Sequence, residues 1–234
     1  MPEIEAGELR GFLAVPDGQG PWPGVVVLHE VYGLTDDIRE YALRFARAGY
    51  LAFAPDLYTH GTRLRCVLRA FRDLAANQGQ AFDDVEAARL WLTGRADCTG
   101  RAGVIGFCLG GGFALLSAAR RDYAVASVNY APVPRKAAEV LSGTCPVVAA
   151  YGGRDRTLPR SAGRLDKALT ELGVRHDVRE YPDAGHAFLN RHKPWLFVRI
   201  LAAAGFREAE AAEAWTAITA FFAEHLALTE GTQR

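Results

Sequence analysis

The sequence has no excess of charge, no long apolar run and few cysteines. Lysine and arginine total 27, as do aspartate and glutamate, so the formal net charge is +0. Proteins that bind nucleic acid or anionic membrane surfaces use a positive field to collect phosphate, so neither partner is expected. No segment reaches the roughly 18 to 20 apolar residues of a membrane-spanning helix. Residues 1–10 contain three glutamates and lack the layout of a secretory signal, so we expect a cytoplasmic protein.

The sequence also lacks the motifs of metal and nucleotide sites. The four cysteines are too few and too widely spaced for a disulfide framework or a paired-cysteine zinc site. His29 and Glu30 do not begin a zinc-binding helix, because Gly33 stands where the second histidine is required. The glycines after Cys108 lack the lysine of a phosphate-binding loop. We therefore expect no metal and no cofactor.

What is present indicates one folded domain over residues 1–234. Half of the residues are apolar and 23% are charged, as in ordinary soluble proteins. A chain of 234 residues can bury a substantial core without a second domain. We see no internal repeat and no low-complexity segment, and a monomer is the expectation for a self-contained domain.

Short apolar runs alternate with helical patterns along nearly the whole chain. The predicted strands cover residues 9–15, 25–29, 51–54, 102–107, 124–130, 147–151 and 176–181. The predicted helices cover residues 36–48, 64–76, 81–92, 110–120, 160–172 and 208–226. Several of the strands are apolar throughout, which is typical of strands covered on both faces. The pattern predicts an α/β fold with an open, mostly parallel sheet flanked by helices on both faces, and functional residues at the carboxyl ends of the strands.

The strongest local motif is Gly106-Phe107-Cys108-Leu109-Gly110, between an apolar strand and a helix of small residues. It has the form of the nucleophile elbow, with cysteine in place of serine. At the start of a helix, the dipole favours the thiolate, and the free amide of Leu109 can receive a developing oxyanion. The alternative is a small buried cysteine in a glycine-rich turn.

Two further polar residues follow later strands. Asp155 comes after the strand at 147–151, and His186 comes after the strand at 176–181. The order nucleophile, acid, histidine is that of the α/β-hydrolase triad, so we predict a Cys108, Asp155, His186 triad. Asp183 is the rival acid, but it lies on the loop that carries His186. Taken singly, each residue is more often structural than catalytic.

Glu30 is a fourth candidate, because it follows the apolar strand at 25–29. A carboxylate in such a position costs free energy unless it is paired or functional. A partly solvated loop acid is the alternative.

Together these motifs resemble the dienelactone hydrolases of the α/β-hydrolase fold. The resemblance includes the elbow, the Gly153-Arg154-Asp155 and Ala184-Gly185-His186-Ala187-Phe188 loops, Glu30, and Ala54-Pro55-Asp56-Leu57-Tyr58. It implies a hydrolase that acts on small esters or lactones with Cys108 as nucleophile, His186 as base and acid, and Asp155 orienting His186. It also implies that Glu30 interacts with the cysteine in the resting enzyme, and that the amides of Val31 and Leu109 form the oxyanion hole.

The sequence departs from the family at the residues that hold a substrate carboxylate. Asn190 stands where the family has an arginine four residues after the histidine, and Arg191 follows it. Arg65, Arg69 and Arg72 are candidates for the other substrate arginine. A bidentate carboxylate clamp requires arginine, which argues against dienelactone itself as the substrate. A thioesterase or acyltransferase on the same triad, or a non-catalytic member with a redox-sensing Cys108 or a partner-binding role, remains an alternative.

Overall fold

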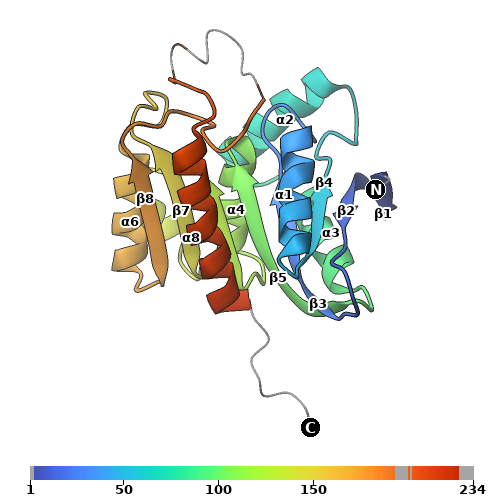
Figure 1. Cartoon of the computed structure of the whole chain (residues 1–234). Helices are drawn as coiled ribbons and strands as arrows, with labels where there is room; N and C mark the ends of the chain where they lie inside the picture. The colour runs from blue at the N-terminus through green and yellow to red at the C-terminus, as the bar shows by residue number, and fades with distance from the viewer. Residues whose placement is uncertain (1–2, 193–199, 201, 227–234) are drawn as a thin grey trace.

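The computed structural model describes residues 3–192, 200 and 202–226, and it is built on one eight-stranded sheet (Figure 1). The sheet order is β1-β2-β4-β3-β5-β6-β7-β8. The strands are β1 (Glu3–Ala6), β2 (Leu9–Ala14), β3 (Trp22–Leu28), β4 (Leu51–Pro55), β5 (Cys98–Phe107), β6 (Val125–Asn129), β7 (Val147–Gly152) and β8 (His176–Tyr181). The pairs β1 with β2 and β2 with β4 are antiparallel, and the six remaining strands pair in parallel, so the predicted mostly parallel sheet is confirmed.

Two helical layers cover the sheet. One face carries α1 (Asp36–Arg47) and α8 (Glu208–Leu226), which stand in front of the sheet in Figure 1. The other face carries α2 (Arg63–Ala76), α3 (Gln80–Thr93), α4 (Leu109–Ala118), α5 (Ala137–Val140) and α6 (Ser161–Glu171). Strand β3 shows why both layers are needed. Val25 and Val27 belong to the core under α1 and α8, whereas Val26 and Leu28 belong to the core under the other helices.

The predicted strands and helices agree with the structure apart from shifts at their ends and two omissions. The prediction missed β1 (Glu3–Ala6), which is short and polar, and α5 (Ala137–Val140), which is a single turn. Neither is long enough to show a periodic apolar pattern. Strand β5 also begins at Cys98, four residues before the prediction, because the polar residues Thr99 and Arg101 hide its start. Within the described residues, no helix is long and apolar enough to cross a membrane.

The topology gathers the candidate residues at one edge of the sheet. Strands β3, β5, β7 and β8 run in the same direction. Glu30 follows β3, Cys108 follows β5, Asp155 follows β7 and His186 follows β8. Residues that are far apart in the sequence therefore meet beyond the carboxyl ends of the strands, which is where open α/β sheets form their sites.

Candidate active site

Cys108 occupies a strained turn between β5 and α4. Its backbone angles are φ 53° and ψ −115°, a region that residues with a side chain seldom adopt. The Cys108 amide donates a hydrogen bond of 3.0 Å to the carbonyl oxygen of Asn129 in β6, and its own carbonyl accepts from the amide of Gly112 at 3.1 Å. These bonds hold the thiol at the start of α4, half-buried among apolar side chains.

The glycines of the elbow are required by close packing of the backbone. A Cβ on Gly106 would lie 2.1 Å from the carbonyl oxygen of Gly110, and a Cβ on Gly110 would lie 2.5 Å from that of His29. Neither backbone contact can relax without moving α4 relative to β3 or β5. The two glycines therefore allow the helix to begin directly above the sheet, with Cys108 at its amino terminus.

His186 and Asp155 are in direct contact. The Nδ1 atom of His186 lies 2.6 Å from Oδ2 of Asp155, and the two side chains are 13% and 2% exposed. Backbone hydrogen bonds fix the His186 loop. The His186 amide donates to Ala202 at 2.9 Å, and its carbonyl accepts from Gly205 at 3.2 Å. The two residues that the sequence predicted as acid and base thus face each other across the loops after β7 and β8.

The second carboxylate oxygen of Asp155 is also occupied. Oδ1 accepts hydrogen bonds from the amide and the hydroxyl of Thr157, at 2.9 and 2.5 Å. Burial acts to raise the pKa of Asp155, but the hydrogen bonds with His186 and Thr157 outweigh it, and the pKa is lowered. The rival acid, Asp183, is exposed and pairs with Arg154. Of the two candidate acids, Asp155 is therefore the one in contact with the imidazole.

The environment of His186 favours its protonated form. Burial acts to lower the pKa, but the hydrogen bonds with Asp155 and with the side chain of Cys108 outweigh it and raise the pKa to about 10. The ring of Tyr130 packs beside the imidazole, with centroids 5.1 Å apart. The surroundings therefore favour the protonated imidazole, with the Asp155 carboxylate on its Nδ1 side.

Glu30 is buried at the same edge but faces a different partner from the one that the resemblance implies. The residue is 2% exposed, and its carboxylate oxygens make no hydrogen bond with any described residue, the Cys108 thiol included. Its Oε2 lies 3.2 Å from Nε2 of His192, whose Nδ1 is 3.0 Å from Asp37. Burial raises the pKa of Glu30, although the nearby His192 and His186 act to lower it.

Sequence reasoning missed His192 and Asp37 as neighbours of Glu30. No local motif marks them, because Asp37 belongs to the first turn of α1 and His192 to the segment after the His186 loop. The hydrogen bonds with Asp37 raise the pKa of His192 against the opposite effect of burial. Only the contact between these distant segments shows that a histidine lies between two carboxylates. The described residues contain no group of three or more potential ligands that could hold a metal ion.

The two backbone amides that the family resemblance implies for the oxyanion hole follow adjacent strands. Leu109 is the first residue of α4, and amides in the first turn of a helix have no partner within the helix. Val31 lies in the turn after β3, which is closed by a hydrogen bond from the Gly33 amide to the Glu30 carbonyl, 3.0 Å long. Strands β3 and β5 are neighbours in the sheet, so both amides belong to the same edge.

The candidate substrate arginines are not gathered around this edge. Arg65 is exposed, Arg69 contacts the Cys66 sulfur, and Arg72 pairs with Asp73. Arg191 stacks on the ring of Phe206, 4.0 Å from its centroid, and Asn190 is buried. None of these residues lines the pocket beside the Glu30 turn.

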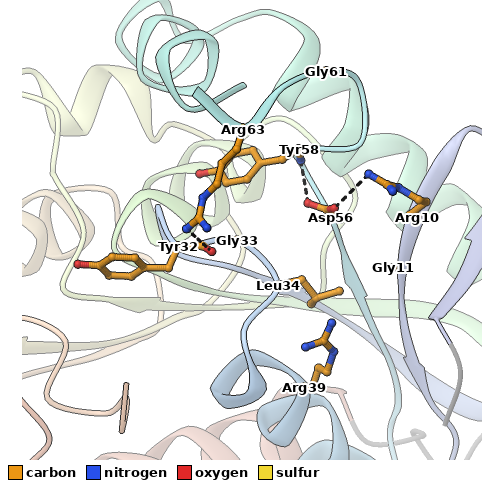
Figure 2. A pocket seen from close by; sticks show the side chains of 10 residues that line it. All are labelled: Arg10, Gly11, Tyr32, Gly33, Leu34, Arg39, Asp56, Tyr58, Gly61 and Arg63. Carbon is orange, nitrogen blue, oxygen red and sulfur yellow. Dashed lines mark hydrogen bonds and ion pairs between the residues drawn. The ribbon is translucent and has the colours of Figure 1, made fainter. Parts of the chain in front are cut away.

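That pocket contains other arginines. It has a volume of about 310 Å³ and is lined by Arg10, Gly11, Tyr32, Gly33, Leu34, Arg39, Asp56, Tyr58, Gly61 and Arg63. Figure 2 shows the guanidinium groups of Arg10, Arg39 and Arg63, from β2, α1 and α2, around the turn at Gly33 and Leu34. Arg63 donates to the Tyr32 carbonyl at 2.8 Å, and Arg10 lies 3.7 Å from Asp56. No local pattern marks this grouping, because the three arginines come from separate elements.

The family model for the dienelactone hydrolase family matches residues 9–226. The chain belongs to the dienelactone hydrolase family. The match extends from β2 to the end of α8, so it includes all four candidate catalytic residues.

Individual relatives agree with the family assignment. A carboxymethylenebutenolidase of Pseudomonas putida is 30% identical over 193 residues, which cover 78% of this chain and 81% of the relative. The crystal structure of a dienelactone hydrolase from Anabaena variabilis has a TM-score of 0.68 and 24% identity, and 96% of each chain is covered. A dienelactone hydrolase-like phosphotriesterase, P91, from metagenomic libraries has a TM-score of 0.72 at 22% identity, covering 93% of this chain and 92% of its own. The last two comparisons establish the fold.

Proposed function

We propose that this family member hydrolyses a small carboxylic ester or lactone through an acyl-cysteine intermediate on Cys108. Membership of the family makes the chain a hydrolase of lactone or ester bonds. The observation that carries the finer proposal is the 2.6 Å contact between Asp155 and His186, at the sheet edge where Cys108 begins a helix in a strained turn. A nucleophile, a proton carrier and an orienting acid gathered at one edge are what covalent acyl transfer requires.

The proposed reaction has two halves. The Cys108 thiolate attacks the carbonyl carbon, and the oxygen becomes an oxyanion held by the amides of Val31 and Leu109. The C–O bond of the leaving group breaks, and His186 gives its proton to the leaving oxygen. His186 then takes a proton from water, the hydroxide attacks the thioester, and the proton returns to the departing sulfur. Asp155 keeps the Nδ1 side of the ring protonated throughout.

Trapping the intermediate tests this proposal. Brief mixing with p-nitrophenyl acetate, followed by acid quench and mass spectrometry, is expected to place one acetyl group on the peptide that contains Cys108. The adduct should disappear with time as deacylation proceeds. The same protocol separates hydrolysis from a redox-sensing role, which predicts sulfenic acid on Cys108 under dilute peroxide and no acetyl adduct. An acyl group that never forms, or one found on another residue, contradicts the proposed mechanism.

The arginine pocket favours substrates that carry an anionic group. Arg10, Arg39 and Arg63 outnumber Asp56 among its charged lining residues. The pocket shares Tyr32 and Gly33 with the turn that carries Val31. A carboxylate attached to the substrate can therefore be held there by charge-assisted hydrogen bonds while the ester is held at the nucleophile.

A pair of matched aryl esters measures this preference. We expect Arg63→Met to lower kcat/KM for 4-acetoxybenzoate about three- to tenfold, because one charge-assisted contact in a solvent-screened site is lost. The methyl ester of the same compound carries no charge and should change less than twofold. Arg65→Met, a neighbouring arginine outside the pocket, is the control and should affect neither ester. Equal losses for both esters in Arg63→Met would show that Arg63 has no role in charge recognition.

A further inference from the structure

His29 is a buried histidine that neither the triad nor the pocket uses. It follows β3 directly, and the residue is 1% exposed. Its Nε2 accepts a hydrogen bond from the Leu57 amide at 3.0 Å, and its Nδ1 lies 2.7 Å from the carbonyl oxygen of Glu30. Both ring nitrogens are therefore engaged by the backbone, one on the loop after β4 and one on the turn after β3.

These contacts determine which nitrogen carries the proton. The Leu57 amide can only donate, so Nε2 of His29 must present its lone pair. The proton of the neutral ring is then on Nδ1, which donates it to the Glu30 carbonyl. Burial lowers the pKa of His29 and keeps the ring neutral. His29 is thus a neutral side chain with one donor and one acceptor, each of them used.

The Glu30 carbonyl belongs to the same peptide unit as the Val31 amide. That unit is planar, with its oxygen and its N–H on opposite sides, so fixing the oxygen fixes the direction of the Val31 N–H. The oxygen also accepts from the Gly33 amide at 3.0 Å, and the Val31 carbonyl accepts from the Tyr58 hydroxyl at 3.2 Å. The ring of Tyr58 packs edge-on against His29, with centroids 4.7 Å apart, and a Cβ on Gly33 would lie 3.4 Å from that ring.

We propose that His29 is a positioning residue that aims the Val31 amide at the oxyanion. The inference rests on the proposed acyl transfer, in which that amide is one of two oxyanion donors. Its physical basis is that an oxyanion donor acts only when its direction is set before the charge develops. The peptide planes of a short turn that contains glycine can rotate. The buried imidazole restricts this rotation, because it links the peptide between Glu30 and Val31 to the loop after β4. A displacement of about 1 Å at such a donor costs on the order of a hundredfold in rate.

Two amide substitutions separate the functions of the ring nitrogens. The side-chain nitrogen of Asn matches the position of Nδ1, and the side-chain amide of Gln reaches the position of Nε2. His29→Asn keeps the donor to the Glu30 carbonyl, and we expect its acylation rate with p-nitrophenyl acetate to stay within about threefold of the wild type. His29→Gln keeps the acceptor for Leu57 but loses that donor, and we expect acylation to fall ten- to a hundredfold.

Alkylation of Cys108 by iodoacetamide is the second measurement. The sulfur displaces iodide from a saturated carbon, so no oxyanion develops, and the reaction reports only on the thiolate and His186. Both variants should be alkylated at the rate of the wild type. Parallel losses of acylation and alkylation in His29→Gln, or equal acylation by the Asn and Gln variants, would overturn the role of His29. A wild-type protein that is not acylated at Cys108 would instead contradict the proposed function, so the two failures are distinguishable.

Discussion

Replacing Cys108 with alanine is expected to lower turnover of p-nitrophenyl acetate by at least about 10⁴-fold. The variant retains the oxyanion amides and the His186–Asp155 pair, but it has no atom that can form the acyl intermediate. Alanine is smaller than cysteine, and the residue lies at φ 53° in either case, so the elbow itself should persist. Initial rates, together with circular dichroism to confirm folding, provide the measurement.

Cys145→Ala is the matched control for this substitution. Burial raises the pKa of the Cys145 thiol to about 12, which makes it unreactive near neutral pH. We expect the variant to keep full turnover, and the acetyl adduct to remain on Cys108. Cys108→Ser is informative as well, because a serine hydroxyl is a much weaker acid than a thiol and His186 must then remove its proton during attack. Turnover above half of the wild-type rate in Cys108→Ala would refute the assignment of the nucleophile.

Replacing Asp155 with asparagine has the second largest expected effect, a fall of about 10³- to 10⁴-fold in kcat/KM. The Asn amide can donate to Nδ1 of His186, which selects the wrong tautomer and turns the basic nitrogen away from Cys108. The substitution also removes the carboxylate that, together with Cys108, raises the pKa of His186 to about 10. The pH dependence of thiol alkylation should therefore change together with the rate of ester hydrolysis.

Asp155→Asn is also expected to change how the stability of the folded protein depends on pH. In the wild type, the pKa of His186 rises from 6.5 to about 10 on folding, so protonation of this residue stabilises the folded protein in full below pH 6.5. That contribution is lost as the pH rises toward 10. Asp155→Asn is therefore expected to be most destabilised relative to the wild type at pH 6 to 6.5, and the difference should shrink at pH 9.5.

Urea midpoints at the two pH values measure this difference. Asp183→Asn, on the His186 loop but exposed, is the control and should shift neither midpoint nor kcat/KM. A destabilisation of Asp155→Asn that does not vary with pH would mean that its carboxylate acts through packing and not through the charge on His186.

The local sequence predicted most of the sheet because each central strand is apolar on both faces. Val25 to Leu28 in β3 is an example, since both sets of alternating side chains enter a core. The short β1 and α5 could not be predicted, because elements of this length carry no periodic signal. The start of β5 was also hidden, since Thr99 is half-buried, Arg101 is exposed, and the pairing with β3 is irregular between Cys98 and Ala102.

The sequence by itself was enough to predict which residues are the candidate nucleophile, acid and histidine, and their order along the chain. Cys108, Asp155 and His186 each follow a predicted strand, and parallel strands bring their carboxyl ends together whatever the loops do. The tertiary structure decided the contacts that depend on side-chain direction. Asp155, and not Asp183, reaches His186; Glu30 faces His192; His29 holds the peptide of Val31; and Arg63 joins Arg10 and Arg39. These pairs join separate loops or helices, and no local pattern of residues encodes the distance between them.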